Sequence, residues 1–334
     1  MRTLIKKPLR PAFTALKQIW RPVRRWTIPH GLILMYHRVA RPRTDPWKLC
    51  VSPENFRDHL ELLCRYARVV PLTELPRRLS RAGRNNRPPV AITFDDGYVD
   101  NLEQALPVLQ HFAAPATLFV ATSWIGSSMP FWSDTLAATV LESQVLPEQL
   151  ELQMGTTSFQ WRRNGAQGAG AREALLRSLW ARLQVLDEVE RSAALERITA
   201  CFGGKAQLDP AARPMTVQEL RKLHASGVFE IGAHTMTHPS LPTLSPEQQM
   251  KEISGSRMQC ERWTGAAPAA FAYPYGDFDA RSAAIVADSG FSLACSAKAE
   301  LVWKHTSRYL MPRVAVPDWD ARQFERQLRQ VWLS

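Results

Sequence analysis

The sequence predicts an α/β protein in which mostly parallel strands form a closed or partly closed barrel, interrupted by a mostly helical insertion. Short apolar runs alternate with amphipathic helical patterns from residue 31 onward, and this alternation is typical of parallel strands joined by right-handed crossovers. About eight such runs lie between residues 31 and 320, a count that fits a barrel better than two open sheets. The alternation stops at Ser123 and resumes near Pro214, which marks the insertion.

Before the insertion, strand and helix patterns follow one another closely. The predicted strands are residues 31–39, 69–72, 90–95 and 116–121, and the predicted helices are residues 53–66, 75–79 and 101–110. The first of these helices rests on Phe56, Leu60 and Leu63 at helical spacing, with Ser52 as its N-cap.

Within and after the insertion, the same patterns define the remaining elements. Residues 172–202 predict a long helical run inside the insertion. Beyond it, the predicted helices are residues 216–225, 246–264 and 279–289, and the predicted strands are residues 229–233, 270–273, 291–295 and 310–316. The chain then divides into a basic leader over residues 1–29, a domain over 30–320 with the insertion at about 123–214, and a C-terminal helix over 321–334.

The positive charge is concentrated in the leader. The net charge is +11, and removing the eight Lys and Arg of residues 1–29 leaves +3 for the rest of the chain. Pro8, Pro11 and Lys17 interrupt any apolar stretch of the kind found in a secretory signal. The apolar residues of the leader can share one face of a basic amphipathic helix lying on an anionic membrane. The alternative is a solvated tail.

Composition excludes several classes of protein. No apolar run approaches the roughly 18 residues of a membrane span. Five cysteines are dispersed without CxxC spacing, which indicates a reducing compartment and predicts a cytoplasmic protein, with peripheral contact at the inner face of the membrane as an option. The weak charge of the body and the lack of basic–aromatic interleaving argue against nucleic acid as a partner.

Chemistry-bearing residues follow several of the predicted strands. Asp95 and Asp96 end one apolar run, and His234 and His238 follow another, four residues apart. Parallel barrels gather their active sites at the carboxyl ends of strands. Two histidines and one aspartate, with coordination positions left for water and substrate, form a hydrolytic metal site. Zinc is the default ion, and nickel or cobalt accept the same ligands.

The metal also explains why two carboxylates stand side by side. One aspartate can bind the cation while its neighbour remains a free base, because the positive charge offsets the repulsion between them. Adjacent residues of a strand face opposite ways, so a bend at Gly97 must turn both toward the site.

These motifs resemble those of the polysaccharide deacetylases of carbohydrate esterase family four, the NodB-homology group. The T-F-D-D-G motif is present as residues 93–97 and the H-[ST]-x-x-H motif as residues 234–238. The resemblance covers roughly residues 31–320 and implies a distorted, incomplete (β/α) barrel. It also implies metal-dependent removal of N- or O-acetyl groups from an oligo- or polysaccharide. By position, Asp95 is then the general base, while Asp96, His234 and His238 bind the metal.

The resemblance also assigns the backbone N–H of Tyr275 to the oxyanion, but two other motifs depart from the family pattern. Ala272 stands where the third motif usually has an arginine, and the late Leu-x-His motif is missing from residues 310–316. A subset resembling exopolysaccharide poly-N-acetylglucosamine deacetylases has an early M-Y-H motif, present here as residues 35–37. That match predicts His37 as the general acid. The alternatives are a hydrogen-bonded strand-end role for His37, with His305 as the acid.

Three further residues have two interpretations each. Arg313 either replaces the missing arginine beside Asp95 or forms a structural salt bridge. Trp132 and Asp134 either line a sugar-binding wall or anchor the insertion.

The leading function is therefore a metal-dependent carbohydrate deacetylase. Two alternatives stay open: a deacylase or deformylase of a lipid-linked sugar at the membrane surface, and a carbohydrate-binding pseudoenzyme.

Overall fold

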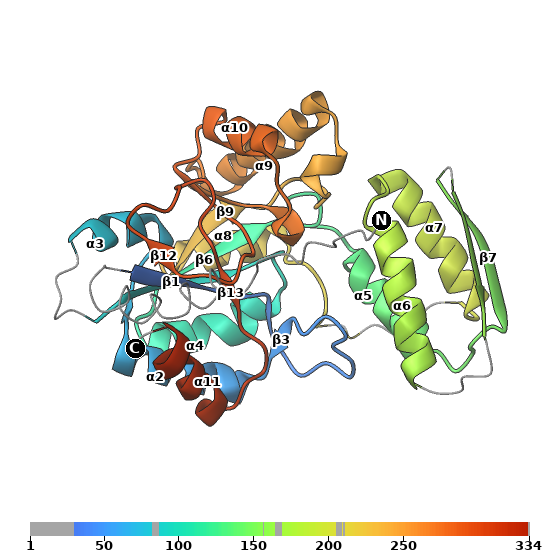
Figure 1. The fold of residues 1–334 in the computed structure, drawn as a ribbon, viewed down its shortest axis with the longest axis horizontal. Coiled ribbons are helices and arrows are strands. Elements are labelled where there is room, and N and C mark those ends of the chain that lie inside the picture. Colours follow the sequence, from blue (N-terminus) through green and yellow to red (C-terminus); the bar gives the residue numbers. More distant parts are fainter. Residues whose placement is uncertain are drawn as a thin grey trace, which may run out of the picture.

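A curled parallel sheet lies at the centre of the fold (Figure 1). The structure is a computed structural model that describes residues 30–81, 87–155, 157–163, 169–204, 209 and 211–332. Six parallel strands stand in the order β11-β10-β9-β6-β5-β1. Their bounds are β1 His30–Tyr36, β5 Pro89–Phe94, β6 Ala116–Val120, β9 Phe229–Ala233, β10 Ala270–Ala272 and β11 Leu293–Cys295. The middle strands β5 and β6 are buried along their whole length because helices cover the sheet.

The last segment of the domain links the two ends of this sheet. Met311 pairs with Cys295 of β11, and β13 (Val314–Ala315) pairs in parallel with β1. At the start of β1, β12 (Val302–Trp303) pairs with it in antiparallel fashion. The sheet therefore curls into an incomplete barrel, and the predicted α/β barrel class is confirmed. Three short strands complete the set: β2 Arg38–Val39, β3 Cys50–Val51 and β4 Arg68–Val69.

Helices pack around the sheet and bury one large apolar core. In Figure 1, α2, α4 and α11 lie below the sheet, and α9 and α10 lie above it. The helix bounds are α2 Pro53–Tyr66, α3 Leu75–Arg81, α4 Leu106–His111, α8 Val217–Ala225, α9 Pro246–Thr264, α10 Ala280–Asp288 and α11 Ala321–Gln327. Shorter helical turns are η1 Leu72–Glu74, η2 Asn101–Ala105, η3 Leu241–Thr243, η4 Pro274–Gly276 and η5 Leu328–Trp332.

The insertion forms a lobe beside the barrel with an apolar core of its own (Figure 1). It consists of α5 Trp132–Glu142, the hairpin β7 Gln149–Met154 and β8 Thr157–Arg162, α6 Ala169–Leu183 and α7 Glu188–Cys201. The hairpin was not predicted, although β7 alternates exposed and buried residues along its length. The helical run expected over 172–202 is broken, because Asp187 caps α7 by accepting the backbone N–H of Glu190.

The predicted leader, residues 1–29, lies outside the described part of the chain. Within the described residues, no helix combines the length and apolar character that crossing a membrane requires.

Candidate active site

The predicted site residues come together at the carboxyl edge of the sheet. Four parallel strands, β1, β5, β9 and β10, end at this edge, and the motif residues follow them directly. One cavity of about 300 Å³ is lined by all six, namely His37, Asp95, Asp96, His234, His238 and Tyr275. Parallel strand order thus converts four distant segments of sequence into one site.

Asp96, His234 and His238 form a group with the dimensions of a metal site. Their ligand atoms all lie within 4.8 Å of one another. The Nε2 atom of His238 is 3.1 Å from Nε2 of His234 and 3.5 Å from Oδ1 of Asp96, and Nε2 of His234 is 3.8 Å from that oxygen. Ligands of a tetrahedral zinc ion lie roughly 3.4 Å apart, given metal–ligand bonds of about 2.0–2.2 Å. The group therefore fits a small divalent cation, and the described residues contain no second group of this kind.

Several residues of the site have unusual backbone conformations. Six non-glycine residues have positive φ within the described ranges, and four of them belong to the motifs: Asp96, Thr235, His238 and Tyr275. Positive φ is energetically unfavourable for residues other than glycine, and residues with this conformation cluster at functional sites. Asp96 has φ 76° and is followed by Gly97 at φ 97°. The bend expected at this position is thus present, and it brings both carboxylates to the cavity.

A backbone carbonyl sets the orientation of the first histidine. The Nδ1 atom of His234 lies 2.7 Å from the carbonyl oxygen of Ala272, to which it donates. The proton on Nδ1 leaves Nε2 unprotonated and directed toward Asp96, as a metal ligand requires. Ala272 is the position where the family pattern has an arginine. In this chain, the main-chain carbonyl at that position orients His234, one of the candidate metal ligands.

The loop between the two histidines is held by residues that the sequence analysis did not identify. Glu252 of α9 accepts the backbone N–H groups of Met236 and Thr237 at 2.7 and 2.9 Å, and the Thr237 hydroxyl at 2.8 Å. Arg191 of α7 donates to the carbonyl oxygen of Thr237 at 3.2 Å. A barrel helix and the insertion therefore both fix this loop.

Asp95 is bound by Arg313 in a buried, bidentate ion pair. The Nη1 and Nη2 atoms of Arg313 donate to Oδ1 and Oδ2 of Asp95 at 2.6 and 2.8 Å, and the two side chains are 1% and 3% exposed. Arg313 also donates to the carbonyl oxygen of Ser296 and the hydroxyl of Thr93. Burial raises the pKa of Asp95, but Arg313 and His234 lower it to about 2. The predicted position of Arg313 beside Asp95 is confirmed.

The electrostatics of Asp96, His234 and His238, the three candidate metal ligands, favour a bound cation. Burial and the neighbouring Asp95 charge raise the pKa of Asp96 well above its usual range. Burial lowers the pKa of His234 to about 4, and burial together with His234 lowers the pKa of His238 strongly. Neutral imidazole is the form that binds metal. A cation at this group would also offset the repulsion between the two carboxylates.

His37 presents its imidazole to the cavity. It lies between β1 and β2, and its main-chain carbonyl accepts from Asn101. Its side chain has no hydrogen-bond partner among the described residues. The alternative of a hydrogen-bonded strand-end role for His37 is therefore not supported. Burial lowers the pKa of His37, although Asp95 opposes this effect. The alternative acid, His305, is exposed in the turn after β12 and is not part of the cavity wall.

Aromatic residues wall the cavity on the side of the insertion. Those that line it are Trp47, Trp124, Phe131, Trp132 and Trp180. The ring of Trp180 on α6 lies edge-on to Tyr275, with centroids 5.7 Å apart, and packs at 5.3 Å from Trp47. Trp132 lines the cavity as one interpretation had it, whereas Asp134 lines a neighbouring cavity. No motif surrounds Trp47 or Trp180, so neither was identified from the sequence.

A family model matches a large part of the sequence. A model described as polysaccharide deacetylase matches residues 82–164 and 183–294, more than half of the chain. The chain therefore belongs to the polysaccharide deacetylase family. A Bacillus subtilis protein, YxkH, whose name places it with polysaccharide deacetylases, is 34% identical over 96 residues. That match spans 28% of this chain and 33% of the relative.

Solved structures share the fold over most of the chain. The Streptococcus pyogenes deacetylase PplD, solved with acetate, has a TM-score of 0.56 at 18% identity, covering 89% of this chain and 97% of that one. IcaB from Ammonifex degensii has a TM-score of 0.58 at 17% identity, covering 91% and 97%. These likenesses confirm the barrel-like fold.

The buried ion pair predicts a strong energetic coupling. Replacing one partner, in Arg313→Met, leaves the Asp95 carboxylate buried and unpaired, which costs about 3–5 kcal/mol. The further change Asp95→Asn should restore a large part of this loss. Urea unfolding of the single and double variants in the presence of a chelator measures the coupling.

A matched control is Arg41→Met, since the Arg41–Glu54 pair is more than half exposed. This variant should lose less than about 1 kcal/mol. Additive losses at Arg313 and Asp95, within about 0.5 kcal/mol, would contradict a direct interaction.

Proposed function

We propose that the chain is a metal-dependent hydrolase that removes N-acetyl or O-acetyl groups from a carbohydrate. The observation that carries this proposal is the spacing of Asp96, His234 and His238, with the ionised Asp95 beside them at 3.9 Å from Nε2 of His234. Bound there, a divalent ion would supply Lewis-acid polarisation of the acyl carbonyl and of the attacking water. Zinc is the expected ion for two imidazoles and a carboxylate, and nickel and cobalt are the alternatives.

Asp95 acts as the general base. Arg313 donates one hydrogen bond to each oxygen of the Asp95 carboxylate. Each oxygen therefore retains a second lone pair that can accept a proton. The carboxylate lines the cavity next to the metal group. It can therefore remove the proton from water as the water attacks the acyl carbon. The low pKa of Asp95 keeps it ionised in the free enzyme.

His37 and Tyr275 complete the proposed machinery. An amide substrate leaves as a free amine only if its nitrogen gains a proton, and His37 lines the cavity with an imidazole that has no other hydrogen bond among the described residues. The backbone N–H of Tyr275 would stabilise the oxyanion of the tetrahedral intermediate. Tyr275 lines the cavity and has a positive φ of 58°.

The proposal also covers the class of substrate, the limits of the catalytic domain and the cellular location of the protein. Family membership supports an acetylated oligo- or polysaccharide as substrate, acted on by a domain over residues 30–320. The basic, amphipathic pattern of residues 1–29 supports contact with the inner face of a membrane, and dispersed cysteines support a cytoplasmic location.

The proposed roles of the base Asp95 and the metal ligand His238 predict different effects of substitution on metal binding. Asp95→Asn should keep the metal, because Asp95 is not a ligand, and should lower acetate release from N-acetylglucosamine oligomers by at least about a hundredfold. His238→Ala should lose the metal as well as the activity. Metal analysis and acetate assays with and without a chelator make the comparison.

Asp100→Asn is the control for loss of a buried ion pair. Asp100 accepts from Arg38 at 2.8 Å and is as buried as Asp95, but it does not line the active-site cavity. It should retain turnover once folded. Full activity in chelated wild-type protein, or in Asp95→Asn, would refute the proposed mechanism.

The role of His37 as proton donor predicts a dependence on the leaving group. His37→Ala should lower the hydrolysis of an N-acetyl sugar by about 10²–10⁴-fold. It should leave the hydrolysis of p-nitrophenyl acetate nearly unchanged, because a phenolate needs no proton to depart. His305→Ala serves as the control and should behave like wild type. Equal losses on amide and aryl ester would show that His37 is not the acid.

A further inference from the structure

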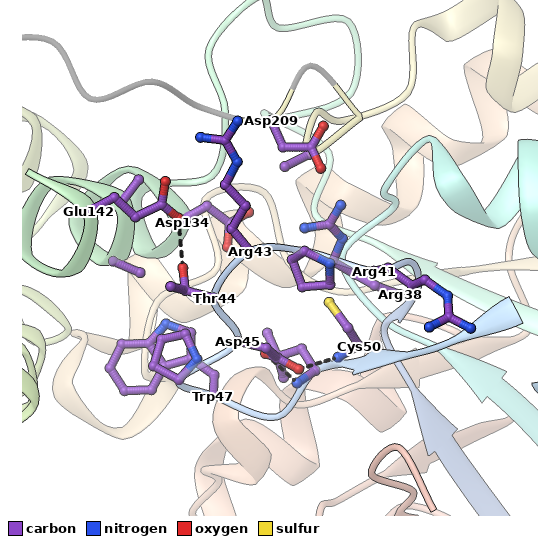
Figure 2. Close-up of a pocket in the computed structure, with 16 residues that line it drawn as sticks. Arg38, Arg41, Arg43, Thr44, Asp45, Trp47, Cys50, Asp134, Glu142 and Asp209 are labelled. Carbon is purple, nitrogen blue, oxygen red and sulfur yellow. Dashed lines mark hydrogen bonds between the residues drawn. The ribbon is translucent and has the colours of Figure 1, made fainter. Parts of the chain in front are cut away.

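The insertion is hydrogen-bonded to the barrel at separate places. One bond lies beside a cavity of about 510 Å³, where Thr44 Oγ1 of a barrel loop donates to Glu142 of α5 at 2.8 Å (Figure 2). Another is the bond from Arg191 of α7 to the carbonyl oxygen of Thr237 at 3.2 Å. The second of these bonds reaches the loop between the two histidines of the metal group, and the first does not.

The carbonyl group that Arg191 binds belongs to the peptide group just before His238. At the other end of the same peptide group, the N–H of His238 donates to Thr235 Oγ1 at 3.0 Å. Hydrogen bonds therefore hold this peptide plane at both ends. The orientation of the plane determines the φ of His238, which is 57°. Such a value persists only where surrounding contacts hold it, so Arg191 acts on the backbone angle that directs a candidate metal ligand.

The guanidinium of Arg191 is buried without a counter-ion. The residue is 2% exposed, and no carboxylate in the described part of the chain lies within ion-pair distance of it. Its Nη1 atom has no hydrogen-bond partner there, and its guanidinium lies 5.4 Å from the ring centroid of Trp132. Burying a charge without an ionic partner is costly. Stability of the insertion alone therefore does not account for an arginine at this position, whereas a role at the loop does.

The charge of Arg191 by itself would weaken the binding of a metal ion nearby. The Glu252 carboxylate, which accepts the N–H and the hydroxyl of Thr237, offsets this charge because it is bound to the same residue. The contribution of Arg191 to metal binding is therefore the placement of His238.

We propose that Arg191 is a positioning residue of the metal group, so that metal binding and docking of the insertion on the barrel are thermodynamically linked. The proposal rests on the proposed function, since it concerns the same metal group. With the insertion docked, Arg191 holds the peptide before His238 and the ligands are preformed. Without this bond the peptide plane can rotate and carry His238 out of the group. By reciprocity, an ion that binds the docked form more tightly must stabilise docking by the same factor.

The zinc affinity of full-length variants tests the role of Arg191. Arg191→Met keeps an apolar stem beside Trp132 but removes the donor to Thr237. It should weaken zinc binding by about 10–100-fold, which is typical for loss of a group that orients a metal ligand. Competition with a chromophoric chelator measures the dissociation constant without substrate.

Two matched controls separate this effect from general damage to the insertion. Arg197 is an exposed residue of the same helix that donates at 2.9 Å to the carbonyl oxygen of Gln153, within the insertion. Arg197→Met should bind zinc as wild type does. Glu142→Ala removes the bond between insertion and barrel that does not reach the loop, and it should also retain wild-type affinity. A loss in either control as large as that in Arg191→Met would overturn the proposal.

Hydrogen exchange tests the reciprocal effect and needs no substitution. In wild type, saturating zinc should slow exchange at the amides of α7 severalfold relative to chelated protein. Arg191→Met should lose this response, and Arg197→Met should keep it. Zinc affinity in Arg191→Met within about twofold of wild type, or exchange in wild-type α7 that does not respond to zinc, would overturn the proposal.

Zinc binding separates this proposal from the proposed function. Weaker zinc binding in Arg191→Met, combined with no acetate release by wild type, would refute the hydrolase and keep the linkage. Zinc-dependent acetate release by wild type, combined with unchanged zinc affinity in Arg191→Met, would keep the hydrolase and refute the linkage.

Discussion

The ion pair between Asp95 and Arg313 is the interaction on which the arrangement of the site depends. Two adjacent carboxylates at one strand end repel each other and would compete for the same cation. Arg313 engages both oxygens of Asp95, so Asp95 stays ionised and oriented while Asp96 faces the two histidines. The different environments give two identical side chains opposite pKa shifts, downward for Asp95 and upward for Asp96.

The rest of the structure supports this division between the two acids. Positive φ values at Asp96, Thr235, His238 and Tyr275 are unfavourable locally and are stabilised by surrounding contacts. Glu252 fixes the loop between the histidines from the barrel side, and Arg191 fixes it from the insertion. The insertion thus has two roles near the site: it helps to hold the loop between the two histidines, and it provides most of the aromatic residues that line the cavity.

The sequence predicted the fold class and the residues that meet at the site, because these depend on local patterns. The strand ends carry the motifs, and parallel strand order brings the motifs together. Arg313 was placed correctly because it lies in the last predicted strand, although it is 218 residues from Asp95. Trp47, Trp180 and Glu252 were missed, since their roles arise from tertiary packing that no local pattern encodes. The hairpin of β7 and β8 was missed because its short alternating runs lay between stronger helical signals.

X-ray absorption at the zinc edge of the metal-loaded protein can distinguish the roles of the two aspartates. We expect a first coordination shell with two imidazole nitrogens and a carboxylate oxygen, altered by Asp96→Ala and His234→Ala but unchanged by Asp95→Asn. A shell that changes in Asp95→Asn while remaining intact in Asp96→Ala would contradict the assignment of the two aspartates.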